Sequence, residues 1–283
     1  MTVFLNGRFV PAEQAVVSVF DRSFLYGDGL FETLRLMRGV PLRWTAHWHR
    51  FAAGAELLGI KLPFTSEFLR ARAAELSEQN ELPEAILRIT LSRGVGQRGY
   101  SPKGADAPTL VMSVHPAPML EAVAPRWKLH LASLRLPAGD ALSASKSANK
   151  LLHVLARAEA DAAGADEALL LNSRGEVVGA SSANLFWVEA DQLHTPPTGT
   201  GALPGVTRAD VMAGCLSQRK TVQETFADSA RLYRAEGCFL TSSSWGVVEV
   251  VALAGQPIAT TPLTQDIREA LLARWRAEGD GGW

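Results

Sequence analysis

The segment His115-Pro-Ala-Pro-Met-Leu-Glu-Ala-Val-Ala-Pro125 divides the sequence into two parts. Proline fixes φ, lacks the backbone N–H and keeps the residue before it out of the helical region, so this segment is expected to run extended and outside regular structure. We therefore predict a small α/β N-terminal domain over residues 1–114, an interdomain linker over 115–125, and a larger α/β C-terminal domain over 126–283.

On the N-terminal side of this segment, strands and helices alternate. Asn6-Gly7 lies between two short apolar stretches, which is typical of a two-residue hairpin turn. Apolar residues at helical spacing predict helices over 45–58 and 66–79. Alternating apolar and polar residues predict a half-buried strand over 87–92, and a further strand is expected over 110–114.

On the C-terminal side the same alternation continues. Helices are expected over 149–163, 207–218, 228–235 and 264–274, and the first of these ends at Gly164, a typical C-terminal cap. Strands are expected over 127–131, 168–171, 176–178, 184–188, 238–241 and 247–251. The fold class is therefore α/β (α+β) in two domains.

Composition excludes several classes of function. The 283 residues are 47% apolar, enough for a sizeable core, and carry a net charge of -1, which gives no field for holding nucleic acid. No charged leader precedes an apolar stretch and no segment is long enough to span a bilayer, so we expect a cytoplasmic protein with no membrane partner. Cys215 and Cys238 are interpreted as buried thiols in a reducing compartment; a disulfide is the alternative.

Lys146 is the strongest candidate for chemistry among the six lysines of the chain. It lies in Ala141-Leu-Ser-Ala-Ser-Lys-Ser-Ala-Asn149, among small residues and directly before a predicted helix. Small neighbours leave room for a bulky ring, and a desolvated amine loses its proton more easily. A solvated loop lysine is the alternative reading, and Lys61, Lys103 and Lys220 are interpreted in that way.

Three further elements suit an anion. In Leu203-Pro-Gly-Val-Thr-Arg208, the N–H groups of Val206 and Thr207 would point out of a helix N-terminus, and Thr241-Ser-Ser-Ser-Trp-Gly246 offers hydroxyls at the end of a strand. Arg50 falls close to the apolar stripe of its helix. The alternatives are an ordinary helix start, a serine-rich turn and an arginine at the rim of the core. His47 and His49 are two apart and do not share a helix face, which disfavours a metal site.

These stretches together resemble the fold-type IV family of pyridoxal-phosphate (PLP) enzymes. The family includes branched-chain aminotransferases, D-amino-acid aminotransferases and aminodeoxychorismate lyases. The similar stretches follow one another along nearly the whole chain: Asp21-Arg-Ser-Phe-Leu-Tyr-Gly-Asp-Gly-Leu-Phe-Glu-Thr33, His47-Trp-His-Arg50, Lys146-Ser-Ala-Asn149, Gly164-Ala-Asp-Glu-Ala-Leu-Leu-Leu171, Ala183-Asn-Leu-Phe186 and Leu203-Pro-Gly-Val-Thr-Arg208.

The resemblance implies a two-domain, D-amino-acid aminotransferase-like fold, a homodimer and a small amino substrate. It implies that Lys146 forms the Schiff base with PLP and moves the proton at the substrate Cα. It further implies that Tyr26 and Phe31 line the substrate side. The residues that it implies for the cofactor phosphate are Arg50, Val206, Thr207, Ser242 and Ser243.

One loop narrows the expected reaction. Ser92-Arg-Gly-Val-Gly-Gln-Arg-Gly-Tyr-Ser101 is similar to the aminodeoxychorismate lyase version of this loop. Arg93 and Arg98 would pair with the two carboxylates of a chorismate-derived substrate, because the guanidinium fork matches a carboxylate. Binding of solvent or of a partner subunit is the alternative for both arginines. The segment Lys146-Ser-Ala-Asn-Lys150 is less typical of the lyases and favours a D-amino-acid or branched-chain aminotransferase.

Gly179 departs from the family pattern. Relatives carry a glutamate five positions before the asparagine that corresponds to Asn184, and that glutamate keeps the pyridine nitrogen protonated so that the ring accepts electrons. Glu176 lies three residues away, on the opposite face of the expected strand. A PLP-binding relative with low activity is therefore the third hypothesis.

Overall fold

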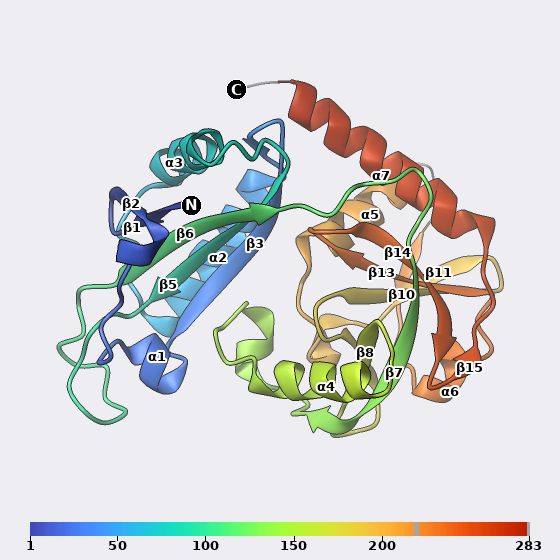
Figure 1. Ribbon diagram of the computed structural model, residues 1–283. Coiled ribbons are helices and arrows are strands. Elements are labelled where there is room, and N and C mark those ends of the chain that lie inside the picture. Colours follow the sequence, from blue (N-terminus) through green and yellow to red (C-terminus); the bar gives the residue numbers. More distant parts are fainter. Residues whose placement is uncertain (218–220, 282–283) are drawn as a thin grey trace. The chain divides into compact units, whose positions relative to one another are not determined.

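The computed structural model describes residues 1–217 and 221–281 (Figure 1). These residues form two compact units. Unit 1 comprises residues 1–118, 145–149 and the chain from Trp275, and unit 2 comprises 119–144 and 150–274. The break after Pro118 lies inside the predicted linker. The short segment Ser145–Asn149, which carries Lys146, packs with unit 1.

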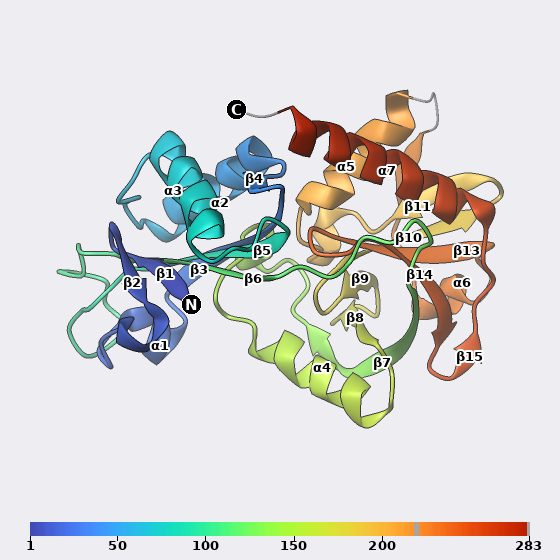
Figure 2. The same ribbon diagram turned by 45° about the horizontal axis from the view of Figure 1, so that its top comes forward.

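Unit 1 is built on an antiparallel sheet with the strand order β2-β1-β6-β5-β3-β4 among the described residues. Its strands are β1 (Thr2–Leu5), β2 (Arg8–Pro11), β3 (Gly29–Met37), β4 (Val40–Pro41), β5 (Ala85–Ser92) and β6 (Thr109–Pro116). Its helices are η1 (Ala12–Gln14), α1 (Arg22–Tyr26), α2 (Trp44–Leu58) and α3 (Ser66–Gln79). Phe51 of α2 and Leu69 of α3 pack against Leu34 of β3 in one core, so α2 and α3 cover the same face of the sheet (Figure 2).

The segment that contains Lys146 pairs with the long strand β3. The backbone N–H of Phe31 donates to the carbonyl of Lys146 at 2.9 Å, and the N–H of Ala148 donates to the carbonyl of Gly29 at 2.9 Å. Leu30 and Ser147 form an antiparallel bridge between these two bonds. The lysine backbone is therefore held against a buried strand of the sheet.

Unit 2 contains a mixed sheet with the strand order β12-β11-β10-β13-β14-β7-β8-β9, and β15 pairs with β14. Its strands are β7 (Arg126–Leu136), β8 (Glu167–Asn172), β9 (Val177–Ala180), β10 (Asn184–Glu189), β11 (Gln192–Thr195), β12 (Val222–Glu224), β13 (Gly237–Ser242), β14 (Gly246–Leu253) and β15 (Gln256–Pro257). Its helices are η2 (Ala141–Ala144), α4 (Leu151–Ala162), η3 (Thr198–Thr200), α5 (Val206–Ser217), α6 (Ser229–Leu232) and most of α7 (Pro262–Asp280).

The predicted elements agree well with this fold. Helix α3 begins and ends where its apolar spacing predicts, and α2 begins one residue earlier than expected. Helix α1 and the strands β3, β4, β11, β12 and β15 were not predicted. Helix α7 is longer at both ends than its pattern indicates, and α6 ends at Leu232 rather than at Ala235. The predicted end of α5 at Gln218 and the residue Lys220 lie outside the described residues. No described helix is both long and apolar enough to cross a membrane.

Candidate active site

Lys146 lies beside an aromatic ring in unit 1. Its Nζ is 4.8 Å from the centroid of the Phe31 ring, and the guanidinium carbon of Arg88 lies 4.0 Å from the same ring. The lysine side chain is half-buried, and its neighbours Ser145 and Ser147 are buried. The predicted residues Lys146 and Phe31 are thus brought together by the pairing of residues 145–149 with β3.

A buried carboxylate organises the adjoining part of unit 1. Both oxygens of Glu32 accept hydrogen bonds from Arg50, from Nε at 2.7 Å and from Nη2 at 2.7 Å. Nδ1 of His47 lies 2.8 Å from the same carboxylate, and Glu32 is only 1% exposed. His49, by contrast, is exposed. Arg50 is therefore fixed by a two-pronged ion pair with Glu32, a residue that was not among the predicted site residues.

The protonation states of Glu32 and His47 follow from their surroundings. Burial alone would raise the pKa of Glu32, but hydrogen bonds from His47 and Arg50 lower it to about 2. Burial lowers the pKa of His47 despite the opposing effect of Glu32. At neutral pH, therefore, Glu32 is ionised, and His47 is neutral and donates its Nδ1–H to the carboxylate.

Unit 2 contains a cradle for an anion at the start of α5. The first amides of this helix, at Val206 and Thr207, have no carbonyl one turn earlier within the helix to bond. The side chain of Asn184 donates to the carbonyl of Leu203 at 2.9 Å and lies so close to Gly205 that a Cβ there would fall 1.9 Å from its Oδ1. A side chain at position 205 would displace the Asn184 amide, so glycine lets that amide lie against the turn that precedes the helix.

Hydroxyl groups surround this N-terminus. Oγ1 of Thr207 and Oγ of Ser243 lie 3.3 Å apart, so the two side chains meet at one place. Oγ of Ser242 accepts from the N–H of Trp245 at 3.2 Å and shapes the turn. Oγ1 of Thr241 is buried and has no hydrogen-bond partner within the described residues. A buried hydroxyl without a partner is unfavourable, and a polar ligand at this site would supply the hydrogen bond that Thr241 lacks.

The position expected to hold a glutamate is a glycine in a strand bulge. Gly179 has φ +152°, and a Cβ there would lie 3.0 Å from the carbonyl oxygen of Ala183. The nearby buried carboxylate of Glu167 is engaged elsewhere, by the N–H of Ala168 at 2.8 Å and by the hydroxyls of Ser181 and Ser182.

Glu176 lies in the β8–β9 turn, where its carboxylate accepts from the amide of Asn172 at 2.7 Å. The carboxylates described on either side of Gly179 therefore stabilise turns rather than replace the missing glutamate.

The two arginines of the 92–101 loop have different surroundings. Arg93 is buried and donates to both oxygens of Asp28 and to the carbonyls of Leu58 and Gly59, at 2.6–3.1 Å. Four hydrogen bonds within unit 1 occupy its guanidinium, so the structure does not support the expected pairing of Arg93 with a substrate carboxylate. Arg98 is exposed, and the predicted residue Tyr26 accepts from the N–H of Gly99 at 3.1 Å through its hydroxyl.

Comparison with known proteins assigns the family. The family model described as amino-transferase class IV matches residues 29–253. A protein of Methanocaldococcus jannaschii, provisionally named a branched-chain-amino-acid aminotransferase, is 35% identical over 91% of this chain and 90% of its own length. The aminodeoxychorismate lyase of Vibrio harveyi is 32% identical over 85% of this chain and 89% of its own.

A solved structure agrees with these two relatives. The branched-chain amino acid aminotransferase of the organism abbreviated T.th., solved with pyridoxamine 5'-phosphate, is 29% identical and covers 99% of this chain and 96% of its own, with a TM-score of 0.89. The chain belongs to the class IV aminotransferase family and is an enzyme with the fold-type IV architecture.

Proposed function

We propose that this enzyme is an aminodeoxychorismate lyase that uses pyridoxal 5'-phosphate to convert 4-amino-4-deoxychorismate into 4-aminobenzoate and pyruvate. Its cofactor follows from the family and from the pyridoxamine phosphate in the related structure. When bound, that cofactor withdraws electrons from the substrate Cα. The single observation that supports the lyase over its relatives is the 92–101 loop, which is similar to the lyase version and leaves Arg98 exposed.

Each unit, taken by itself, contains donors of the kind that suit the cofactor. In unit 1, Lys146 would hold its aldehyde, because the amine lies beside the Phe31 ring on a segment fixed by two backbone hydrogen bonds. In unit 2, the amides of Val206 and Thr207 and the hydroxyl of Ser243 would hold its phosphate. Ser242 would support this cradle through its bond to Trp245.

Arg50 would add positive charge for the phosphate, and Glu32 would limit that charge. The carboxylate keeps the guanidinium in one orientation, since both of its oxygens are bonded to Arg50. Neutral His47 adds no further charge to this cluster.

Lys146 would also move the proton in the reaction. With the cofactor bound, the lysine amine would be placed to act as the base that takes the Cα proton of the substrate. The Phe31 ring covers one side of that amine, which lies 4.8 Å from the ring centroid. Arg98 would contact the rest of the substrate, and Tyr26 would support the loop that contains Arg98, because its hydroxyl accepts from the N–H of Gly99.

The experiment measures two products from one incubation. Purified enzyme loaded with cofactor is given 4-amino-4-deoxychorismate, and pyruvate and 4-aminobenzoate are both quantified. We expect equal amounts of the two products from the wild type and none from Lys146→Ala. The same variant should lose the near-visible absorbance of the bound cofactor and the adduct that borohydride fixes to the protein. Retention of that adduct would show that another lysine holds the cofactor.

An amino acid aminotransferase is the second candidate, because the 35% identical relative is named as a branched-chain enzyme. It is tested by supplying L-leucine and D-alanine as separate amino donors and measuring the 2-oxo acid formed. Oxo acid without pyruvate release from 4-amino-4-deoxychorismate would replace the lyase assignment.

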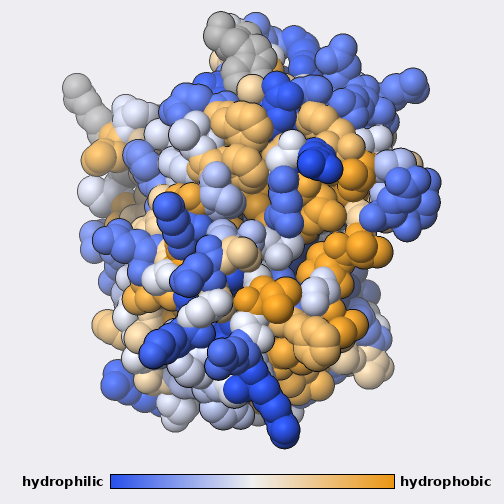
Figure 3. Space-filling model, turned by 90° about the vertical axis from the view of Figure 1, so that its left-hand side faces the viewer, coloured by the Kyte–Doolittle hydropathy of each residue, from blue (hydrophilic) through white to orange (hydrophobic). Residues whose placement is uncertain are grey.

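We also propose that the enzyme is a cytoplasmic homodimer. Exposed apolar side chains gather over a short part of unit 1: Val16, Val17, Val19, Phe20, Phe24 and Leu25. Figure 3 shows apolar residues grouped in patches between polar ones on one face of the molecule. Several large apolar side chains exposed within one short segment favour a protein interface there.

A further inference from the structure

The 99–101 segment of the substrate loop is held by one buried side chain. Arg22, at the first position of α1, is 3% exposed and donates to three consecutive carbonyls. Its Nη1 bonds the oxygens of Gly99 at 2.9 Å and Ser101 at 3.1 Å, and its Nη2 bonds that of Tyr100 at 3.0 Å. A guanidinium that binds three successive carbonyls leaves this stretch of backbone little freedom to move.

Arg22 is itself fixed by a shared carboxylate. Oδ2 of Asp28 accepts from Nε of Arg22 at 2.8 Å and from Nε of Arg93 at 2.8 Å. Arg93 extends the arrangement to the carbonyls of Leu58 and Gly59, at the end of α2. A cation at a helix C-terminus is favourable, so the carboxylate is anchored to a helix packed on the sheet.

Tyr26 adds three further contacts to the loop and its anchor. Its hydroxyl accepts from the N–H of Gly99, its ring lies 5.0 Å from the guanidinium carbon of Arg22, and it packs edge-on against Tyr100 at 5.5 Å. The side chains of Arg98 and Tyr100 are nevertheless exposed, Tyr100 by 87%. The backbone of residues 99–101 is thus held by several hydrogen bonds, while the side chains of Arg98 and Tyr100 are exposed and could bind a substrate.

We propose that Arg22 is a positioning residue for substrate recognition: by holding the backbone of residues 99–101, it fixes how Arg98 is presented and so sets the affinity for a substrate carboxylate. This inference rests on the proposed function, in which Arg98 binds that carboxylate. It assigns Arg22 and Asp28 to specificity although neither side chain needs to touch the substrate.

Lysine at position 22 is the informative substitution. It keeps the positive charge but supplies a single ammonium, which cannot reach Asp28 and three carbonyls together. Full-length, cofactor-loaded protein is titrated with succinate, and with the uncharged succinamide as a control that carries no carboxylate and should not bind. We expect Arg98→Ala and Arg22→Lys each to weaken succinate binding about tenfold, the loss expected for a charged hydrogen bond. The double variant should bind no more weakly than Arg98→Ala alone.

Two controls separate positioning from general damage. Arg8→Lys makes the same chemical change at an exposed position of β2 and should bind succinate like the wild type. If Arg22→Lys does not fold, Tyr26→Phe is used in its place, because it removes only the hydroxyl that accepts from Gly99. This variant should weaken succinate binding by about threefold, which is less than the loss expected for one hydrogen bond to a charged group.

The outcomes are decisive. Wild-type affinity for succinate in both Arg22→Lys and Tyr26→Phe would overturn the inference, and so would a further loss when Arg22→Lys is added to Arg98→Ala. Absence of succinate binding by the wild type, or binding that Arg98→Ala leaves unchanged, would also overturn it. These titrations need no turnover, so a wild type that releases neither pyruvate nor oxo acid would refute the proposed function without deciding the role of Arg22.

Discussion

At the scale of single residues, Glu32 stabilises the fold and also holds Arg50, a residue proposed to bind the cofactor phosphate. It is buried in β3 and is the common partner of His47 and Arg50. Removing one partner of a buried ion pair leaves the other charge without compensation, which is strongly destabilising. We expect Glu32→Gln to lower the free energy of unfolding at pH 7 by about 3 kcal/mol. The measurement is urea unfolding of the wild type and the variant.

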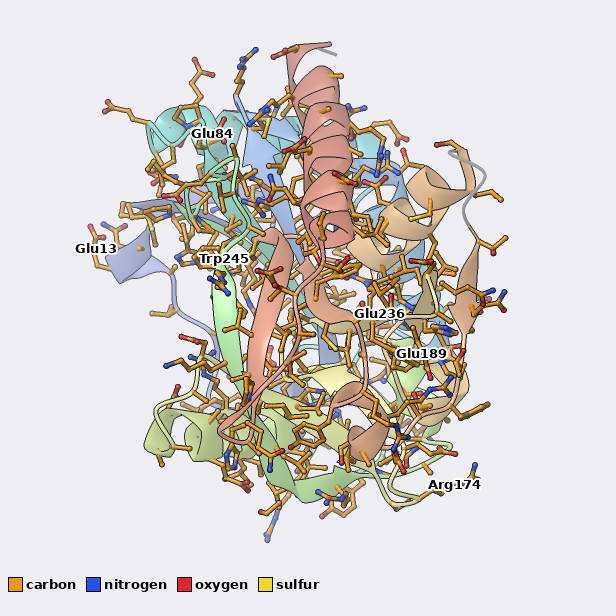
Figure 4. The ribbon with its side chains drawn as sticks, turned by 90° about the vertical axis from the view of Figure 1, so that its right-hand side faces the viewer. Glu13, Glu84, Arg174, Glu189, Glu236 and Trp245 are labelled. Atoms are coloured by element: carbon orange, nitrogen blue, oxygen red, sulfur yellow. The ribbon has the colours of Figure 1, made fainter. Side chains whose placement is uncertain are left out.

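Glu13→Gln is the matched control, because Glu13 is exposed in η1 and its side chain points away from the ribbon (Figure 4). It should leave the unfolding midpoint unchanged. A loss for Glu32→Gln no larger than that of the control would contradict the role assigned to the buried pair.

The same carboxylate gives a pH dependence. Its pKa is lowered from 4.5 to about 2 in the folded protein, so its stabilisation is complete above pH 4.5 and is lost as the pH falls towards 2. A difference of 4.5 − 2 = 2.5 pKa units corresponds to about 3 kcal/mol. Glu32→Gln should therefore flatten the dependence of stability on pH between 4.5 and 2.

At the scale of elements, the bulge in β9 contains a glycine at the position where the family resemblance leads us to expect a glutamate. The pairing of β8 with β9 shifts register after Leu170, which pairs with Gly179. A side chain at 179 meets the Ala183 carbonyl and a φ that favours glycine, so both Gly179→Ala and Gly179→Glu should lose about 1–2 kcal/mol of stability. A carboxylate there would keep the cofactor ring protonated, so we expect Gly179→Glu to turn over at least about tenfold faster than Gly179→Ala.

The comparison of the two variants isolates the carboxylate from the strain. Equal rates would show that the enzyme needs no carboxylate at position 179. A wild-type rate in the ordinary enzyme range, on the order of 1–10³ per second, would in addition exclude the low-activity hypothesis.

Helix α3 could be predicted from its amphipathic pattern, and the buried strands β8 and β10 from unbroken apolar runs, whereas strand β3 could not. Helix α3 buries Leu69, Ala73 and Leu76 at helical spacing, so its period is visible. Strand β3 is buried along nearly all of its length, so it shows no alternation, and Glu32 and Arg35 interrupt its apolar run. A charged residue inside such a run was the available signal for the Glu32 cluster.

The site was predictable only in its local parts. Lys146 could be predicted because small residues surround it in the sequence. The α5 cradle could be predicted because the residues of its turn are consecutive. Arg22 bonds residues 77 to 79 positions away, and Arg93 bonds Asp28 across 65 positions. No periodicity or spacing indicates such pairs, so Arg93 could not be distinguished from a substrate ligand until its partners were known.

At the scale of the whole molecule, the proposed dimer has a direct test. The chain has a mass of 30.4 kDa, and light scattering coupled to gel filtration should give twice that value. Phe24→Glu should shift the protein towards the monomer, because Phe24 is 75% exposed among the apolar residues of 16–25. Leu216→Glu, at an exposed apolar position of α5, is the control and should stay dimeric. A monomeric wild type at all concentrations would contradict the proposal.

Residues 145–149 belong to unit 1 although the chain on either side of them belongs to unit 2. This arrangement limits where the gene could be divided into two functional parts. The chain passes from one unit to the other after residues 118, 144, 149 and 274. A fragment ending at the predicted linker would therefore contain β3 without its lysine, and the complementary fragment would contain the lysine without the strand that seats it. Splitting the coding sequence at the linker would yield two pieces that must reassociate before any amine is in place.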